Sequence, residues 1–408
     1  MSTLSNTRLS IIRYIQAFFI PDSSLHSRQK WLLGLINLSA VVILWVSSSF
    51  LVNEMVEDNS YRKPFFITWI NTSCFTLYII PYLKIKKLNI TNFLKKFKND
   101  YEYSKLPANK NEEGLIRNYG SDDNLANTAS SIEENNTVIT NDEELNNSLD
   151  INIYETFQLS VQFIILWFSA NLVTNASLSY TSVASQTILS STSSFFTLII
   201  GYLVSVEKIN QNKIMGILLS FSGVLIVTKA DTSESNPNNG GKHFSPLLIL
   251  WGNLLALSGA LIYGIYTILL KFKISIPNSK KERNLNTHLF FGFVGLICLI
   301  GFWPILIILH FTNIEKFQLP SEKIMSIFLI VNASITFISD FCWCNAVLLT
   351  SPLTVTVGLS MTIPLAMIGD WVLKGFDLNL LYIFGAIIVA TGFLIINKDE
   401  EEDFVIDE

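Results

Sequence analysis

The chain has 408 residues, of which half are hydrophobic and only 15% are charged, and its mean hydropathy is +0.41. Soluble domains carry about a quarter charged residues, whereas here the charges are concentrated between long stretches that contain none. This pattern excludes an ordinary soluble domain and predicts an all-α polytopic membrane protein. The net charge of −5 says little, since most of the acidic residues lie in one loop and the tail. The expected partner is a lipid bilayer, and no nucleic acid is expected.

Ten apolar runs follow one another along the chain, and we interpret each as one transmembrane helix of about 20 residues. The first is too long for a signal-peptide core and lacks a small-residue cleavage site, so it is interpreted as a signal anchor. The fourth, rich in Ser and Thr, and the short fifth are compatible with helices buried among others. The runs are Trp31–Val52, Pro64–Leu83, Phe157–Ser177, Ser182–Val204, Ile214–Val227, Leu247–Leu270, Leu289–Leu309, Ile324–Leu348, Pro352–Leu373 and Asn379–Ile396.

The basic residues between these runs predict the orientation, because cytosolic loops are rich in Lys and Arg. With a cytosolic N-terminus, 21 of the 28 basic residues fall on the cytosolic side and seven on the other. We therefore expect both termini to face the cytosol. The predicted parts are a cytosolic tail (1–30), helices one and two (31–83), a cytosolic loop (84–153), helices three to five (154–228), helices six to ten (247–397) and an acidic cytosolic tail (398–408).

The segment 84–153 is the one large hydrophilic insertion. It opens with six lysines beside the membrane and then becomes acidic and rich in Asn and Ser, with few aromatic residues. Such a composition cannot bury enough apolar surface to fold alone, so the segment is predicted to be disordered. The lysines are interpreted as an inside-positive anchor rather than as a lipid site.

An internal repeat relates the two halves of the chain. The pattern G-x6-G-x-L-I-x-x-K runs from Gly216 to Lys229 at the end of run five and from Gly385 to Lys398 at the end of run ten. Upstream, the segment that begins at Asn175 matches the one that begins at Asn345 with one residue deleted. Since five is odd, the second half must enter the membrane from the opposite side. The sequence thus predicts ten transmembrane helices as two inverted five-helix repeats, the geometry of many secondary transporters.

These motifs resemble those of the drug/metabolite transporter (EamA-like) superfamily. The stretches Asp340-Phe-Cys-Trp343, 345–352 and 359–364 resemble more narrowly the F subgroup of solute carrier family 35, whose fungal vacuolar members share a long loop between helices two and three. The resemblance implies a ten-helix carrier with a central cavity, a small-molecule substrate and a location in the vacuolar membrane. It does not identify the substrate.

Two aspartates lie inside predicted spans and are candidates for binding a substrate or an ion. Asp340 is in run eight and Asp370 is near the end of run nine. A carboxylate at the bilayer centre costs about 2.5–3.5 kcal/mol, so it normally faces a cavity or a partner. For Asp340 the roles considered are binding a cationic substrate, coupling to protons, or packing against hydroxyl groups. For Asp370, close to the interface, packing is favoured.

Three further residues complete the candidate site. Gln186 and Asn171 are polar residues in the spans that the repeat relates, and Trp343 could stack on a ring or a cation. Pro364 should free a backbone carbonyl in run nine, which can coordinate a ligand. The cysteines and histidines show no metal-ligand or redox spacing, so no metal and no cofactor are expected, and the oligomeric state is left open.

The predicted function is secondary-active transport of a small organic solute by alternating access. Sugar nucleotides and phosphate esters call for Arg or Lys in the site, and the runs offer only acid. A cationic or neutral solute, with thiamine-like compounds as one option from the resemblance, is therefore favoured over a nucleotide sugar. The alternatives are a scaffold or receptor that acts through the 84–153 loop, and a membrane-embedded enzyme, for which paired catalytic residues are missing.

Overall fold

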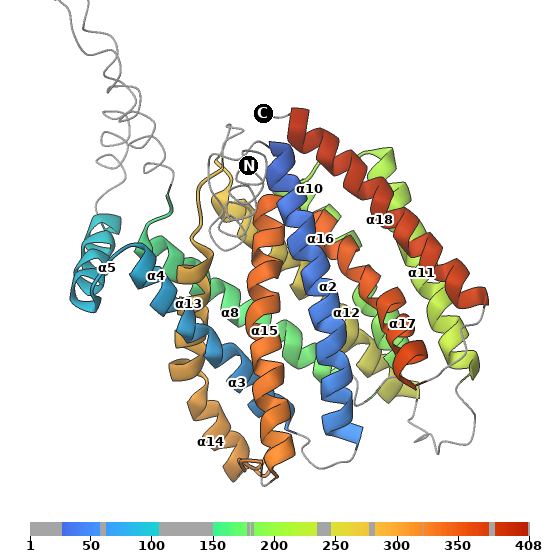
Figure 1. Cartoon of the computed structure of the whole chain (residues 1–408), viewed down its shortest axis with the longest axis horizontal. Coiled ribbons are helices and arrows are strands. Elements are labelled where there is room, and N and C mark those ends of the chain that lie inside the picture. Colours follow the sequence, from blue (N-terminus) through green and yellow to red (C-terminus); the bar gives the residue numbers. More distant parts are fainter. Residues whose placement is uncertain are drawn as a thin grey trace, which may run out of the picture.

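The computed structural model is a bundle of helices with both ends of the helical part on the same face (Figure 1). Within the part of the chain that the structure describes there are no β-strands, only two isolated β-bridges. The described residues are 27–57, 63–105, 150–177, 180, 183–234, 246–276, 282–320, 322–374 and 380–406.

The helices follow the predicted apolar runs, although several runs are broken into two or three pieces. In chain order they are α2 (Ser27–Glu57), α3 (Pro64–Ser73), the 3₁₀ helix η1 (Cys74–Tyr78), α4 (Ile79–Ile85), α5 (Ile90–Ser104), α8 (Ile153–Ser177), α9 (Val183–Ser191), α10 (Ser193–Leu203), α11 (Gln211–Glu234), α12 (Pro246–Ile274), α13 (Thr287–Gly301), α14 (Trp303–Phe311), α15 (Lys323–Leu349), α16 (Pro352–Gly358), the 3₁₀ helix η2 (Leu359–Met361), α17 (Thr362–Lys374) and α18 (Leu380–Ile406).

Eight helical segments of the described chain are long and apolar enough to cross a membrane. They are Ser27–Leu51, Phe65–Ile85, Ile153–Thr174, Gln211–Lys229, Leu250–Ile274, Thr287–Phe311, Lys323–Leu349 and Pro352–Gly369. The predicted runs four and ten are not among the eight. Run four is divided between the short helices α9 and α10, and run ten forms α18.

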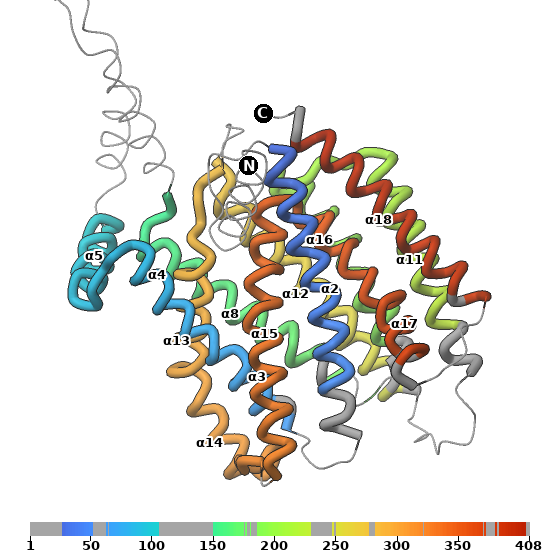
Figure 2. The backbone as a smooth tube through the Cα atoms, in the orientation of Figure 1, coloured from blue at the N-terminus to red at the C-terminus, as the bar shows by residue number. Residues whose placement is uncertain are grey.

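Successive spans run in alternating directions between two faces of the bundle (Figure 2). We call the face at which α2 begins and α18 ends the terminus face, and the other the opposite face. Contacts across the terminus face tie distant segments together. Trp31 at the start of α2 donates to Asn397 of α18 (3.2 Å) and packs against Phe404, and Arg283 pairs with Glu155 at the start of α8.

Prolines account for the interruptions in three spans. A proline removes the hydrogen bond to the carbonyl four residues earlier and crowds it, so the preceding turn often tightens into a 3₁₀ helix. Pro81 follows η1 and Pro364 follows η2 at this spacing, and Pro304 stands in the first turn of α14, next to the break from α13. In run nine, the turn before Pro364 is accordingly the 3₁₀ helix Leu359–Met361.

The glycines of the repeated pattern bring α11 and α18 into close contact. A Cβ on Gly392 would lie 2.6 Å from the carbonyl oxygen of Gly216, and a Cβ on Gly216 would lie 3.0 Å from the carbonyl oxygen of Gly392. Gly223 and Gly385 oppose each other in the same reciprocal way, with 2.9 Å and 3.2 Å to the partner's carbonyl oxygen. Only residues without a side chain allow two helix backbones to approach this closely.

The prediction of disorder over 84–153 is wrong for the beginning of that segment, because residues 90–104 form helix α5. Phe93 is buried, and Phe97, one turn later, packs against Phe157 of α8 and Phe293 of α13 at ring-centre distances of 5.6 and 6.2 Å. An aromatic pair at this helical spacing forms an apolar face, which anchors α5. Residues 106–149 lie outside the described residues.

The acidic segment 398–408 is also not separate from the core, since α18 continues through it to Ile406. Asp399 accepts hydrogen bonds from Asn210 (2.6 Å) and Asn212 (2.8 Å) at the start of α11. Glu400 is buried, 2.5 Å from the ammonium group of Lys213. Two of the acidic residues are thus bound by the loop and helix that follow α10.

Candidate functional site

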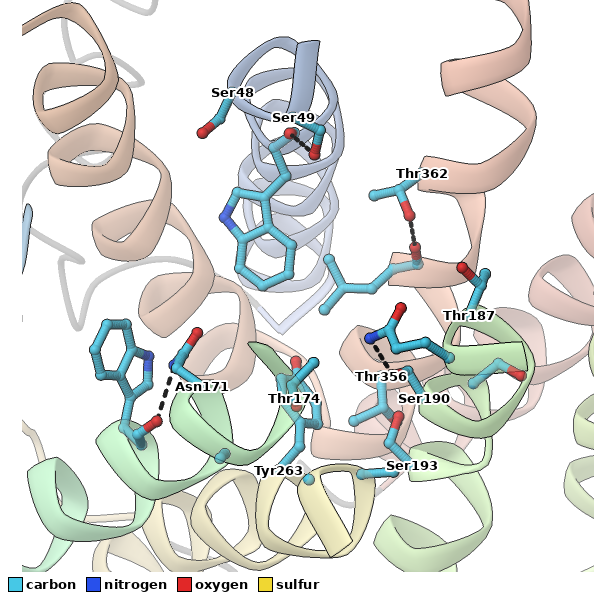
Figure 3. Close-up of a pocket in the computed structure, with 18 of the residues that line it drawn as sticks. Ser48, Ser49, Asn171, Thr174, Thr187, Ser190, Ser193, Tyr263, Thr356 and Thr362 are labelled. Atoms are coloured by element: carbon cyan, nitrogen blue, oxygen red, sulfur yellow. Dashed lines mark hydrogen bonds between the residues drawn. The ribbon is translucent and has the colours of Figure 1, made fainter. Parts of the chain in front are cut away.

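A cavity of about 500 Å³ lies among α2, α3, α8, α9, α12, α15 and the broken segment α16–η2–α17 (Figure 3). Its lining residues come from the middle of these helices and from the part nearer the opposite face. Cavities of this size accommodate small organic molecules. The breaks in α9–α10 and α16–η2–α17 contribute directly to the lining, with Ser191, Ser193, Leu359 and Ser360.

Hydroxyl groups are the most numerous polar groups of the cavity lining. Many of them donate to a carbonyl of their own helix, such as Ser49 to Trp45 (2.9 Å), Ser191 to Ile188 (2.7 Å) and Thr362 to Leu359 (2.6 Å). This bonding satisfies the hydroxyl hydrogen inside a membrane and leaves the oxygen lone pairs able to accept. The hydroxyl residues of the lining are Ser48, Ser49, Thr68, Thr174, Thr187, Ser190, Ser191, Ser193, Thr336, Thr356, Ser360 and Thr362.

The two predicted amide residues lie in this same cavity. Asn171 of α8 donates to the carbonyl of Trp167 (2.8 Å), and Gln186 of α9 donates to the hydroxyl of Ser190 (2.9 Å), as Figure 3 shows. In both side chains the amide nitrogen makes the bond within the helix. The amide oxygen can therefore face the cavity and accept a hydrogen bond. The structure therefore brings together two residues that are 15 positions apart in sequence and lie on different helices.

Asp340 of α15 also lines the cavity and is only 6% exposed. The indole of Trp45 lies within hydrogen-bonding reach of its carboxyl group. Among the described residues, the second oxygen, Oδ2, has no hydrogen-bond partner. Buried carboxylates are normally satisfied by several donors, so this oxygen is available to a cation, a proton or a donor group of a bound solute.

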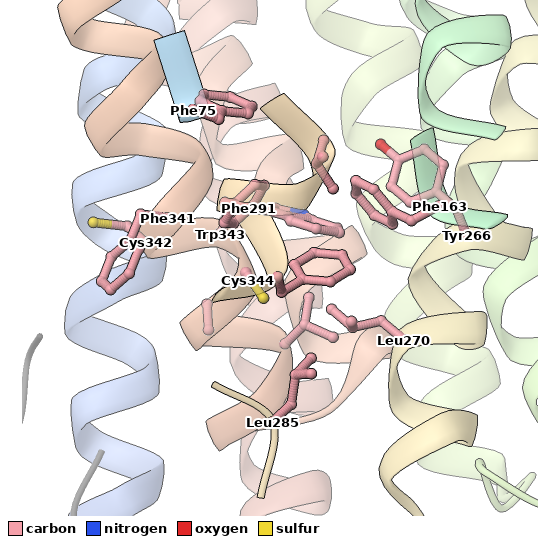
Figure 4. Packing of buried hydrophobic residues seen from close by; sticks show 14 of the residues in the cluster. Phe75, Phe163, Tyr266, Leu270, Leu285, Phe291, Phe341, Cys342, Trp343 and Cys344 are labelled. Carbon is pink, nitrogen blue, oxygen red and sulfur yellow. The ribbon is translucent and has the colours of Figure 1, made fainter. Parts of the chain in front are cut away.

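Four aromatic side chains also line the cavity. Trp45 and Trp167 line it together with Tyr263 and Tyr266 of α12. Trp343, predicted as a binding residue, is not part of the described lining. It is buried in the core cluster that Figure 4 shows. Its indole nitrogen donates to the hydroxyl of the lining residue Tyr263 (3.0 Å) and so positions that side chain.

The cavity does not extend to the terminus face, because core residues lie between them. In α8, for example, the lining residue Asn171 lies farther from that face than the core residue Phe163, and the same order holds for Asp340 and Cys344 in α15. It also holds in α2, α12 and α16. The half of the bundle toward the terminus face is filled by aromatic and aliphatic side chains around Phe163, Phe291 and Trp343 (Figure 4).

Two buried charged groups close the terminus face at the turn between α15 and α16. Lys271 of α12 donates to the carbonyl oxygens of Thr350 (3.0 Å) and Leu348 (3.2 Å) at the end of α15. Glu207, after α10, accepts from the backbone N–H of Leu353 (3.1 Å) in the first turn of α16. The positive charge of Lys271 lies at the C-terminal end of α15, where the free carbonyls carry partial negative charge. The negative charge of Glu207 lies at the N-terminal end of α16, where the free N–H groups carry partial positive charge.

Glu207 belongs to a larger buried network. Lys213 of α11 has a side chain only 2% exposed and reaches Glu400 (2.5 Å), Asp403 (3.2 Å) and Glu207 (3.9 Å). Burial raises the pKa of Glu207, the neighbouring Glu400 adds to the rise, and Lys213 opposes it. This network joins the α10–α11 loop, α16 and the end of α18 into one closed surface.

Asp370 is placed by its backbone in α17, but its side chain lies outside the described residues. Sequence reasoning missed most of the hydroxyl residues and both tyrosines. The high Ser and Thr content of run four was the available signal, because apolar spans have no need of so many hydroxyls. In the described part of the chain, no group of three or more His, Cys, Asp and Glu residues could hold a metal ion.

Comparison with known proteins shows which family this chain is similar to. Residues 146–229 match the model of the EamA-like transporter family. An uncharacterized vacuolar membrane protein of Saccharomyces cerevisiae is 46% identical, with 92% of both chains covered. From the same organism, the thiamine-repressible mitochondrial transport protein THI74 is 38% identical over 91% of this chain and 92% of its own.

More distant similarities point the same way. Solute carrier family 35 member F5 of Pongo abelii is 28% identical over 92% of this chain and 78% of its own length. A solved crystal structure with 11% sequence identity superposes with a TM-score of 0.55 over 90% of this chain and 98% of that chain. The latter similarity shows a shared fold across nearly the whole length.

Proposed function

Because this chain belongs to the EamA-like transporter family, as a member similar to the F subgroup of solute carrier family 35, we propose that it transports a small organic solute by secondary-active alternating access. The observation that carries the proposal is the cavity in the middle of the bundle, which holds the partly unpaired carboxylate of Asp340. The family is one of transporters, which favours transport over an enzymatic activity. We place the protein in the vacuolar membrane, as its 46% identical relative is named for that membrane.

The proposed architecture is ten spans in two inverted five-helix repeats. Interruptions support it, since they occur in spans two and seven and in spans four and nine, which are equivalent under the repeat. Helix pairing supports it as well: α8 packs along α12 and α15 packs along α2, so spans three and six correspond to spans eight and one. The repeat equates Gly216 with Gly385 and Gly223 with Gly392, so it exchanges the Gly216–Gly392 contact with the Gly385–Gly223 contact. A two-fold axis between the repeats would produce this pair of contacts.

We propose a cationic or neutral solute, with thiamine-like compounds among the candidates. Asp340 is the only charged residue among the described lining residues. The aromatic residues of the lining can stack on a ring or a cation. Its hydroxyl groups can accept hydrogen bonds. A nucleotide sugar would bring negative charge to Asp340 without a basic partner, and so it fits this cavity poorly. Protons are the proposed coupling ion, with Asp340 as their acceptor.

The alternative is a scaffold or receptor that acts through the long loop and transports nothing. Uptake by purified protein in liposomes separates the two, with solutes offered as three groups: organic cations, neutral compounds and nucleotide sugars. Accumulation or counterflow of a cation or neutral compound supports the carrier. Flux of nucleotide sugars alone contradicts the substrate class, and absence of flux for all three groups favours the scaffold.

Asp340→Asn tests the mechanism, because it keeps the size of the side chain and removes its charge and titration. If the carboxylate couples protons, the variant exchanges solute but no longer concentrates it. If it binds the solute directly, exchange falls as well, by about tenfold or more for the loss of a buried charged partner. Asp100→Asn is the matched control, since Asp100 accepts from the backbone N–H of Ile153 (3.0 Å) outside the cavity. Wild-type concentrative uptake by Asp340→Asn would remove this residue from the mechanism.

A further inference from the structure

Helix α5 has a second apolar face that the bundle does not cover. Its packed face consists of Phe93, Phe97 and Asp100, and Asp100 caps the start of α8 through the N–H of Ile153 (3.0 Å). Ile90 and Leu94 are one helical turn apart and lie beside that face, exposed by 67% and 58%. Large apolar residues exposed in a row on a firmly anchored helix indicate a surface that meets something other than water.

The position of α5 brings this apolar row to the level of the membrane surface. The chain leaves the span α3–η1–α4 at Ile85 and turns at Lys87, which has a positive φ of 50°, before α5 begins at Ile90. Figure 1 shows α5 at the edge of the bundle, beside the end of α4. Since α4 ends at the terminus face, α5 lies where apolar lipid gives way to headgroups.

Basic residues border the apolar row. Lys98 lies one turn after Leu94, Lys105 lies one turn after Tyr101, and Tyr101 continues the row from Leu94 with 37% of its surface exposed. Lys95 lies one helical turn before Lys98 and farther around the helix from the apolar row. A helix that combines an apolar face with flanking lysines typically lies in the membrane interface, with long cationic side chains reaching to the headgroups.

We propose that α5 is a lipid-binding helix of the transporter that inserts Ile90, Leu94 and Tyr101 into the adjoining leaflet and binds anionic lipid headgroups through Lys95, Lys98 and Lys105. The partner is the protein's own membrane, identified by charge complementarity. This inference replaces the interpretation of the lysines as a topology signal alone, and it is independent of which solute the cavity binds. Because Asp100 and Phe97 fix α5 against α8 and α13, lipid composition can act on the transport bundle through this helix.

Fluorophores at two positions test the insertion. The full-length protein is labelled at Leu94→Cys or at Asn99→Cys, which is exposed on a different face of α5, and is reconstituted with brominated lipids that quench on contact. Unmutated protein treated with the same reagent corrects for labelling of the native cysteines. We expect the label at position 94 to be quenched several-fold more strongly than that at position 99 in vesicles rich in phosphatidylserine. Equal quenching at the two positions would overturn the proposal.

The charge requirement is tested in the same vesicles. We expect Lys95→Gln with Lys98→Gln to weaken the contact of position 94 with the lipid by roughly fivefold per lysine. Added salt should weaken it too, because it screens charges near the surface. Lys96→Gln is the matched control, since Lys96 lies on the far side of the helix from the apolar row, and it should have little effect. If quenching is unchanged in vesicles of phosphatidylcholine alone and in the Lys95/Lys98 variant, binding of anionic lipid is excluded.

Discussion

The two halves of the bundle solve the problem of buried polar groups in different ways. In the half that holds the cavity, several hydroxyl and amide groups bond to their own helices, although Ser48 of α2 donates to Asn332 of α15 (2.6 Å). The Oδ2 atom of Asp340 has no hydrogen-bond partner among the described residues. In the half toward the terminus face, the charges of Lys213, Glu207 and Lys271 are neutralised by partners on other segments. The polar groups of the cavity half can therefore bind a ligand, whereas the ion pairs of the other half hold separate segments together.

Under the proposed alternating-access mechanism, this difference indicates which parts of the bundle must move. Alternating access requires that the closed half opens while the cavity half closes. The interactions that must break on opening are the ion pairs and hydrogen bonds around the α15–α16 turn, rather than the contacts of each helix with itself. Ion pairs and backbone bonds are suited to this role because water can replace their partners once the surface opens, while an apolar contact has no such replacement.

The largest expected effect comes from breaking the closed half at Lys213. Lys213→Ala leaves Glu207 and Glu400 buried next to each other without their cation, which should destabilise the closed state by about 3–5 kcal/mol. Thermal unfolding of the detergent-purified protein measures this loss. Lys398→Ala is the control, because the Lys398 side chain is 80% exposed and pairs with Glu402 of the same helix at 3.9 Å. Its removal should therefore change stability by less than ~0.5 kcal/mol. Similar losses for both variants would mean that the Lys213 network does not hold the terminus face.

Thiol reactivity gives the next largest contrast and reports directly on the two halves. Cys342 and Cys344 are buried in the closed half, whereas Ser190→Cys would place a thiol in the cavity. A polar thiol reagent should modify position 190 at least ~100-fold faster, because the native thiols react only after the closed half opens. Mass spectrometry of labelled peptides over time measures both rates. Lys213→Ala should raise the rate at Cys342 and Cys344 selectively, and equal rates at all three thiols in the unmutated protein would contradict a closed half.

The sequence predicted the helical class, and eight of the ten apolar runs form helical segments long and apolar enough to cross a membrane. Three of the five candidate site residues line the cavity. Asp340, Gln186 and Asn171 could be found because a charge or an amide is costly inside an apolar run unless it faces a cavity or a polar partner. Trp343 could not be placed correctly, since an aromatic residue in a span packs or binds according to helix rotation, which sequence does not show. Helix α5 was not predicted, because the polar composition of the whole segment 84–153 indicated disorder. The helical spacing of Phe93 and Phe97 within it was not considered.

The glycine contact between α11 and α18 is expected to give a smaller effect. Gly392→Ala would place a Cβ 2.6 Å from backbone atoms of both Gly216 and Ser220, which cannot move as a side chain can. The variant should lose about 1–3 kcal/mol of stability through overpacking. Gly301→Ala serves as control, because its nearest neighbour would be 4.0 Å away. Unfolding in a denaturant series compares the two, and an unchanged Gly392→Ala protein would show that α11 and α18 separate without cost.

The smallest effect is expected from removal of residues 106–149. This stretch is acidic and rich in Asn and Ser, so it has little apolar surface with which to stabilise the bundle. Its deletion, with a short flexible linker in its place, should change the melting temperature of the purified protein by no more than a few degrees. A longer deletion that also removes α5 (Ile90–Ser104) should cost more, because Phe93 and Phe97 then no longer cover Phe157 and Phe293. Liposome uptake by the shorter deletion is the second measurement: retained flux assigns transport to the bundle alone. A large loss of stability with the shorter deletion would show that the stretch belongs to the fold.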